Sequence, residues 1–120
     1  MPDTAWTLRF STRYRDQLGE RAYRERRGEI ERRLAELLKD PYRAAGSERL
    51  KFTFTGLRSA RVAGGVRLIF KICEECRSLS DRSRNSLDCC LASDTPNATV
   101  NVLCLSSHYT GVPDEFEFDP

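Results

Sequence analysis

The sequence predicts an α+β protein in which an antiparallel sheet of about four strands carries an N-terminal helix pair on one face. Two observations lead to this fold class. The first is the order of the patterns, which runs from one short strand through two helices to a series of strands. The second is a hairpin pattern in the stretch Glu48–Phe70, where two strands flank the turn residues Ala63-Gly64-Gly65.

The first two elements of the chain are short. Trp6–Phe10 alternates apolar and polar residues, which is typical of a strand with one buried face. Ser11 or Thr12 can accept hydrogen bonds from the backbone N–H groups that begin a helix, so we expect a helix up to about Leu18. Gly19 should end it, because glycine is a poor helix former.

A longer helix is expected from about Arg21 to Lys39. Its apolar residues follow one another at spacings that form a single stripe on a helix of 3.6 residues per turn. They are Tyr23, Ile30, Leu34, Leu37 and Leu38. The helix should end at Asp40, since Pro41 disfavours a helical conformation in the residue before it.

The remaining strands lie after residue 48. Arg49–Thr55 alternates apolar and polar residues, the two hairpin strands follow, and Val100–Leu105 is a strongly apolar last strand. The acidic tail that follows Tyr109 is expected to be irregular. Helices first and strands afterwards favour helices packed on one face of an antiparallel sheet.

The hairpin also predicts which side chains share a face. If the turn consists of residues 63–65, Arg61 faces Arg67 across the two strands. The apolar face then carries Ala60, Val62, Val66, Leu68, Phe70 and Ile72, and the polar face carries Ser59, Arg61, Arg67 and Lys71. Two guanidinium groups opposite each other are unfavourable unless an anion lies between them. A phosphate is the expected anion, because guanidinium groups bind its oxygens in bidentate fashion.

Length and composition indicate one compact domain over residues 1–120. No apolar run reaches the roughly 20 residues that span a bilayer, and the N-terminus lacks the pattern of a secretory signal, so we expect a cytoplasmic protein without a membrane partner. The charge is uneven: residues 1–70 hold 16 Lys and Arg against 9 Asp and Glu, whereas residues 71–120 hold 4 against 9. A basic first part is compatible with a nucleic-acid partner, although arginines on the long helix also fit a solvated surface.

Residues 73–99 are a polar, cysteine-containing insertion where a tight hairpin would suffice. Four cysteines lie in it, namely Cys73, Cys76, Cys89 and Cys90. The spacing of the first two is typical of zinc sites, whereas adjacent cysteines such as the last two rarely bind one metal together. The sequence thus leaves open a structural zinc site or reduced thiols without metal. Cys104, inside the last strand, is expected in the core.

The order of these motifs resembles the RelE/ParE toxin superfamily, and within it the YoeB-type branch most of all. The matching residues are Glu48, Leu50-Lys51, Gly56, Ser59, Arg61, Arg67-Leu68-Ile69-Phe70 and His108-Tyr109. The match needs no gap from Glu48 to Phe70, and it covers about Trp6 to Tyr109 apart from the insertion. The resemblance implies a RelE-like fold.

The resemblance further implies the toxin of a type II toxin–antitoxin system, which cuts mRNA on the ribosome and is silenced by a cognate antitoxin. In such enzymes no cofactor is used. The matching positions imply that Glu48 is the general base, that Arg67 stabilises phosphate charge, and that His108 is the general acid. Substrate binding would fall to Lys51, Arg61 and Tyr109. These residue types suffice for metal-free RNA cleavage, in which the 2′-hydroxyl attacks the phosphate.

An alternative function stays open on the same fold. A gyrase inhibitor or a degenerate toxin would be a binding module without catalysis. Glu48 would then be a solvated loop residue and His108 a surface residue at the end of a strand. Arg61 and Arg67 rest on the hairpin geometry, whereas Glu48 and His108 rest on the resemblance.

Overall fold

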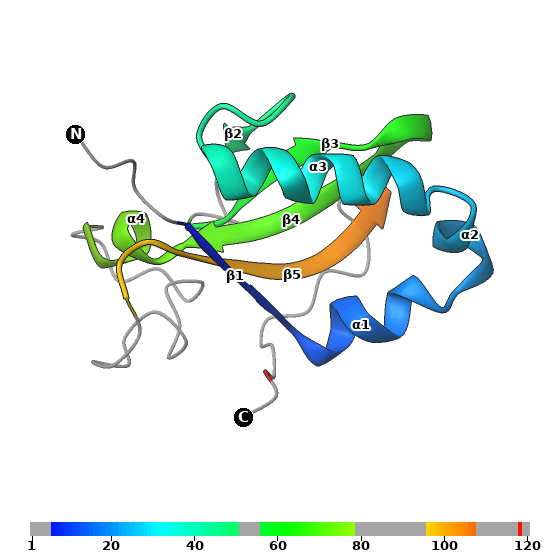
Figure 1. Cartoon of the computed structure of the whole chain (residues 1–120), viewed down its shortest axis with the longest axis horizontal. Coiled ribbons are helices and arrows are strands. Elements are labelled where there is room, and N and C mark those ends of the chain that lie inside the picture. Colours follow the sequence, from blue (N-terminus) through cyan, green and yellow to red (C-terminus); the bar gives the residue numbers. More distant parts are fainter. Residues whose placement is uncertain (1–5, 51–55, 79–95, 108–117, 119–120) are drawn as a thin grey trace.

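The computed structural model describes residues 6–50, 56–78, 96–107 and 118. Within these ranges, five strands and four helices alternate with turns (Figure 1). In chain order they are β1 (Thr7–Phe10), α1 (Thr12–Leu18), α2 (Arg21–Arg24), α3 (Arg27–Lys39), β2 (Glu48–Arg49), β3 (Arg58–Arg61), the 3-10 turn Ala63–Gly65, β4 (Val66–Ile72), α4 (Cys73–Ser78) and β5 (Thr99–Ser107). No helix among the described residues is long and apolar enough to cross a membrane.

The described strands form one sheet in the order β1-β5-β4-β3-β2. Neighbours from β5 to β2 are antiparallel, as predicted, but β1 lies parallel to β5. The prediction of about four antiparallel strands therefore needs correction in both number and direction. The alternation in residues 6–10 shows which side chains are buried, but not which distant strand will pair with them or in which direction.

Two predicted boundaries also change. The strand expected over Arg49–Thr55 begins one residue earlier, at Glu48, and residues 51–55 lie outside the described residues. The last strand is longer than predicted and runs from Thr99 to Ser107. Helix α4 was not predicted at all, and it forms the start of the polar segment that the sequence marks as an insertion.

The long helix predicted from Arg21 to Lys39 is wrong as one element, because it is interrupted between α2 and α3. Arg26 has φ −105° and ψ 15°, which is outside the helical region. Gly28 next to the break lowers helix propensity. Tyr23 of α2 is partly buried and packs against the core. Leu38 lies outside the buried stripe and is 47% exposed.

Helix α1 agrees with the prediction. Ser11 caps it by accepting a hydrogen bond from the N–H of Tyr14, and Gly19 follows its last residue. Beyond the end of β1, helix α1 lies along the edge of β5 and contacts it. The side-chain amide of Gln17 donates to the carbonyl of Leu105 at 2.8 Å and accepts from the N–H of Leu105 at 2.7 Å. The Gln17 side chain therefore provides hydrogen-bond partners for the buried N–H and carbonyl of Leu105, at an edge where no described strand pairs with β5.

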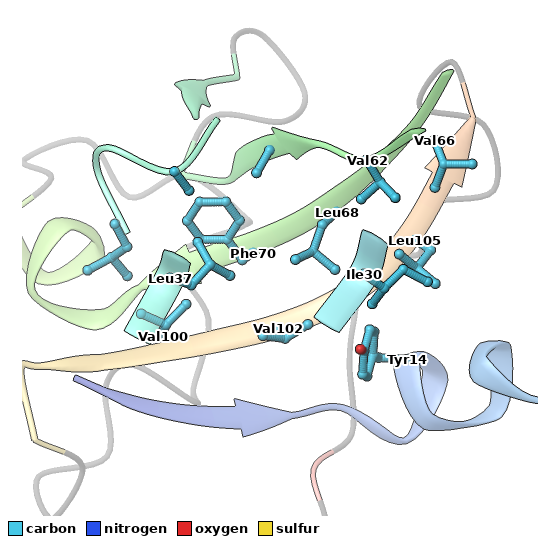
Figure 2. Close-up of a cluster of buried hydrophobic side chains, with 13 residues drawn as sticks. Tyr14, Ile30, Leu37, Val62, Val66, Leu68, Phe70, Val100, Val102 and Leu105 are labelled. Atoms are coloured by element: carbon cyan, nitrogen blue, oxygen red, sulfur yellow. The ribbon is translucent and has the colours of Figure 1, made fainter. Parts of the chain in front are cut away.

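The main core lies between α3 and the sheet, and Figure 1 shows α3 crossing in front of β3 and β4. Figure 2 shows Ile30 and Leu37 of α3 facing the hairpin residues Val62, Leu68 and Phe70. All six residues predicted for the apolar face of the hairpin are buried in this cluster. The prediction of that face is confirmed.

A second, smaller cluster covers the opposite face of the sheet. Ile69, Leu103 and Cys104 are buried there together with Leu57. The register between β4 and β5 shifts after Ile69, so two consecutive residues of β5 turn to the same face. Cys104 is buried as predicted, and burial raises the pKa of its thiol to about 12.

Candidate functional site

The hairpin places two arginines side by side, as its turn length predicted. Arg61 of β3 and Arg67 of β4 are register partners. Gly64 and Gly65 in the turn have φ values of 69° and 81°, which glycine adopts without strain. Because Val66 and Leu68 face the α3 side, the two arginines belong to the opposite face of the sheet.

The guanidinium group of Arg67 is held by three acceptors. Its Nε donates to the hydroxyl of Ser59 at 2.9 Å. One Nη donates to the carbonyl of Gly46 at 3.0 Å and to a carboxylate oxygen of Glu48 at 3.3 Å. The other Nη donates to none of the described residues, so two N–H groups are left for a ligand. Arg67 is thus fixed in orientation and retains binding capacity.

Glu48 and Arg67 form an ion pair, which brings together two residues that the sequence placed in one site. Their closest oxygen and nitrogen are 3.3 Å apart. The Glu48 side chain is 59% exposed, whereas that of Arg67 is 17% exposed. Glu48 is the register partner of Ser59, so strand pairing places its side chain on the same face as Arg67. The carboxylate is accessible to a substrate that approaches this face.

The loop before β2 completes the site. Gly46 has φ +72°, and a Cβ at this position would lie 3.0 Å from the Cβ of Arg61. The backbone N–H of Arg61 donates to the carbonyl of Ala45 at 2.9 Å. The loop therefore packs directly on β3, and only glycine allows both this approach and the direction of the carbonyl toward Arg67.

Helix α3 anchors the same loop from the core side. A carboxylate oxygen of Glu36 accepts from the N–H of Ala45 at 2.9 Å, and this hydrogen bond lowers the pKa of Glu36. Arg33 pairs with Glu36 and also donates to the carbonyl of Arg61. The helix thus holds both the loop before β2 and the β3 backbone at Arg61. The sequence analysis missed this link because contacts between a helix and a loop have no periodic signal.

Arg61 differs from Arg67 in its surroundings. Its side chain is exposed, and it forms no ion pair with any residue in the described ranges. Like charges opposite each other are costly when nothing compensates them, and here Glu48 compensates Arg67 alone. A second anion between the two arginines would be favourable, which fits the predicted phosphate.

Three predicted site residues, Lys51, His108 and Tyr109, lie outside the described residues. Ser107, the residue before His108, ends β5 as the register partner of Val66. Ser106 is the partner of Arg67. The role expected of His108 stays a prediction.

The cysteines are placed only in part. Cys73 and Cys76 are buried in α4, where the Cys73 sulfur accepts from the side-chain amide of Asn101 at 3.0 Å. Cys89 and Cys90 lie outside the described residues. Among the residues that the structure describes, no three His, Cys, Asp or Glu side chains are grouped as metal ligands. The zinc hypothesis, which needs all four cysteines, stays a prediction.

A hollow of about 270 Å³ lies elsewhere, between α1 and α3. Phe10, Tyr14 and Leu34 contribute to its apolar wall, and the ion pair of Arg27 with Glu31 lies at its edge. None of the predicted catalytic residues lines it. Its apolar character does not suit a charged phosphate.

Comparison with known proteins agrees with this architecture. The chain is similar to a chain in the crystal structure of the toxin–antitoxin complex RelBE2 from Mycobacterium tuberculosis, with a TM-score of 0.57. The similarity covers 88% of this chain and 97% of that chain, at 23% sequence identity. The two chains share a fold. No protein-family profile and no curated protein sequence matches this chain. The RelE-like fold inferred from the motifs is therefore supported by a structure, and the finer YoeB-type assignment stays a prediction.

Proposed function

We propose that this protein is the toxin of a type II toxin–antitoxin pair and that it cleaves mRNA on the ribosome. The observation that carries the proposal is the Arg67 guanidinium, held by Ser59, Gly46 and Glu48 and faced by Arg61. Such a cluster offers a base and two cations on one accessible face. The shared fold with a chain of the RelBE2 toxin–antitoxin complex supports an antitoxin as partner.

The proposed reaction is transfer of a phosphoryl group within the RNA chain. Glu48 accepts the proton of a 2′-hydroxyl, whose oxygen then forms a bond to the neighbouring phosphorus. Arg67 and Arg61 bind the non-bridging oxygens, where negative charge increases in the transition state. The bond from phosphorus to the 5′-oxygen breaks as His108 donates a proton to that oxygen. The products are a 2′,3′-cyclic phosphate and a 5′-hydroxyl.

Glu48 is placed for this role by its contact with Arg67. In the absence of RNA, the carboxylate shares the guanidinium with Ser59 and Gly46. A phosphate bound between the arginines would place the neighbouring 2′-hydroxyl near the carboxylate without requiring Arg67 to move. Lys51 and Tyr109 are proposed to bind the RNA beside the site, through charge and through stacking on a base respectively.

Expression in a bacterial host tests the proposal. The wild-type protein should arrest growth, and Arg67→Ala should relieve the arrest, because loss of one group that stabilises transition-state charge lowers such rates by about 100-fold or more. Arg32→Ala is the matched control, since Arg32 pairs with Glu29 on the outer surface of α3. The control should remain as toxic as the wild type.

If Arg67→Ala is folded and arrests growth as strongly as Arg32→Ala, the assignment of this site is wrong. A binding module without catalysis would instead arrest growth while cellular mRNA stays intact. Measurement of mRNA cleavage in the arrested cells therefore separates the proposal from its alternative.

A further inference from the structure

A buried carboxylate in α4, that of Glu75, is not one of the proposed catalytic or RNA-binding groups. The side chain of Glu75 is 6% exposed. Its oxygens accept from the Nε of Arg58 at 3.0 and 3.2 Å and from the Nε of Arg49 at 3.2 Å. A carboxylate removed from water requires such charged partners, and here two guanidinium groups from the sheet provide them.

The two arginines come from the strands that carry the site. Arg49 of β2 and Arg58 of β3 are register partners, and the next pair along the ladder is Glu48 with Ser59. Successive residues of a strand point to opposite faces. Glu75 therefore bridges β2 and β3 from the α3 side, whereas Glu48 and Ser59 contact Arg67 on the other side.

Helix α4 also holds the loop that leads into β2. Arg58 donates to the hydroxyl of Ser47 at 3.1 Å, and its guanidinium lies 4.9 Å from the centre of the Tyr42 ring. The Tyr42 hydroxyl in turn donates to Glu74 at 2.7 Å. The segment 41–49 is thus attached to α4 and its arginine partner on one side and to Arg67 on the other.

Strand β2 needs this support. It has two residues and pairs with β3 alone among the described strands. So few backbone hydrogen bonds do not hold an edge strand in place without side-chain packing. The position of Glu48 accordingly depends on what holds the rest of its segment.

We infer that Glu75 is a positioning residue, which acts through Arg49 and Arg58 to hold β2 where Glu48 meets Arg67. This inference rests on the proposed function, in which Glu48 is the base. It gives the first turns of the insertion a purpose: α4 supports the catalytic strand from the opposite face of the sheet. Glu75 itself does not contact the RNA.

The test uses Arg49→Gln and Glu75→Gln in the full chain. The Arg49 side chain is 67% exposed, so its replacement removes one arm of the bridge while Arg58 still pairs with Glu75. Arg43→Gln is the matched control, because Arg43 lies in the same segment, is 87% exposed and pairs with Asp40. All three proteins should show the far-UV circular dichroism of the wild type.

The first measurement is hydrogen exchange of the backbone N–H of Leu50, which donates to the carbonyl of Leu57 at 3.0 Å. It should exchange about tenfold faster in Arg49→Gln and Glu75→Gln, because local opening of β2 becomes easier. Exchange in Arg43→Gln should equal that of the wild type. This measurement requires no activity.

The second measurement is single-turnover cleavage of ribosome-bound mRNA. Arg49→Gln should lower the maximal cleavage rate by about 100-fold, since a displaced base affects the chemical step. The protein concentration that gives half of the maximal rate should not change. Added to Glu48→Gln, it should cause no further loss. Unchanged exchange at Leu50, or a full second loss in the double variant, would overturn the inference. A wild-type protein that cleaves nothing would refute the proposed function, and the exchange data alone would then decide whether Glu75 holds β2.

Discussion

At the scale of single residues, the site depends on the orientation of one guanidinium group. Arg67 donates to a hydroxyl from β3, to a carbonyl from the loop before β2, and to a carboxylate from β2. A planar group with several N–H donors can satisfy all of them and still bind a phosphate. Lysine has no fixed plane, so Arg67→Lys would keep the charge and lose the geometry.

Gly46 is the residue whose replacement should disturb this orientation most simply. Gly46→Ala would force a side chain into a left-handed backbone conformation and place its Cβ 3.0 Å from that of Arg61. We expect it to lower the free energy of unfolding by about 1 to 2 kcal/mol, as measured by urea denaturation. Gly28→Ala is the matched control, because a Cβ there meets nothing within 4 Å in α3. It should raise the free energy of unfolding by about 0.5 to 1 kcal/mol. Equal effects of the two substitutions would contradict the assigned role of Gly46.

The part of the site that the sequence predicts is the part determined by local geometry. Turn length sets the register that makes Arg61 and Arg67 partners. Only the family resemblance predicted that Glu48 and Arg67 lie close together. The loop between β2 and β3 is long, so its length does not determine which residues of the two strands pair. The contacts of Gly46 and Glu75 were missed, since each depends on elements that meet only in the folded chain.

At the scale of elements, the residue pattern of a strand or helix predicts its buried face but not the partner or direction of its pairing. The hairpin faces and the buried stripe of α3 were predictable, because each repeats with the period of its own element. The cap of α1 was predictable because serine is a residue type that caps helices. The parallel pairing of β1 with β5 and the break between α2 and α3 were not, because tertiary packing decides them. Helix α4 is too short for a periodic signal.

The edge of β5 offers a test at this scale. Gln17 forms two hydrogen bonds with the backbone of Leu105, and both residues are buried. Gln17→Leu has similar size but leaves a buried N–H and a buried carbonyl without partners, so it should destabilise the protein by about 2 to 3 kcal/mol.

Thermal or urea unfolding measures this effect. Asp16→Ala is the control, because the Asp16 side chain is exposed on the same helix. It should change the free energy of unfolding by less than about 0.5 kcal/mol. A Gln17→Leu protein as stable as this control would show that α1 does not complete the edge of β5.

At the scale of the whole molecule, the sheet separates two tasks. Helix α3 and the main core occupy one face, and the arginine pair lies on the other. In β4, residues of the main core alternate with residues of the other face, so the strand that contributes the most residues to the main core also carries Arg67. Residues 1–70, which contain both arginines, also hold the excess of positive charge that suits an RNA partner.

The central claim is that the face carrying Arg67 cleaves RNA through the 2′-hydroxyl. The most direct measurement is incubation of purified protein with ribosomes bearing a defined mRNA, followed by mapping of the new ends. Wild-type protein should produce a 2′,3′-cyclic phosphate and a 5′-hydroxyl, and a single 2′-deoxynucleotide at the cleavage position should abolish the cut. Arg67→Ala should cleave at least about 100-fold more slowly. Intact mRNA with the wild-type protein, or cleavage that ignores the 2′-deoxy substitution, would contradict the account.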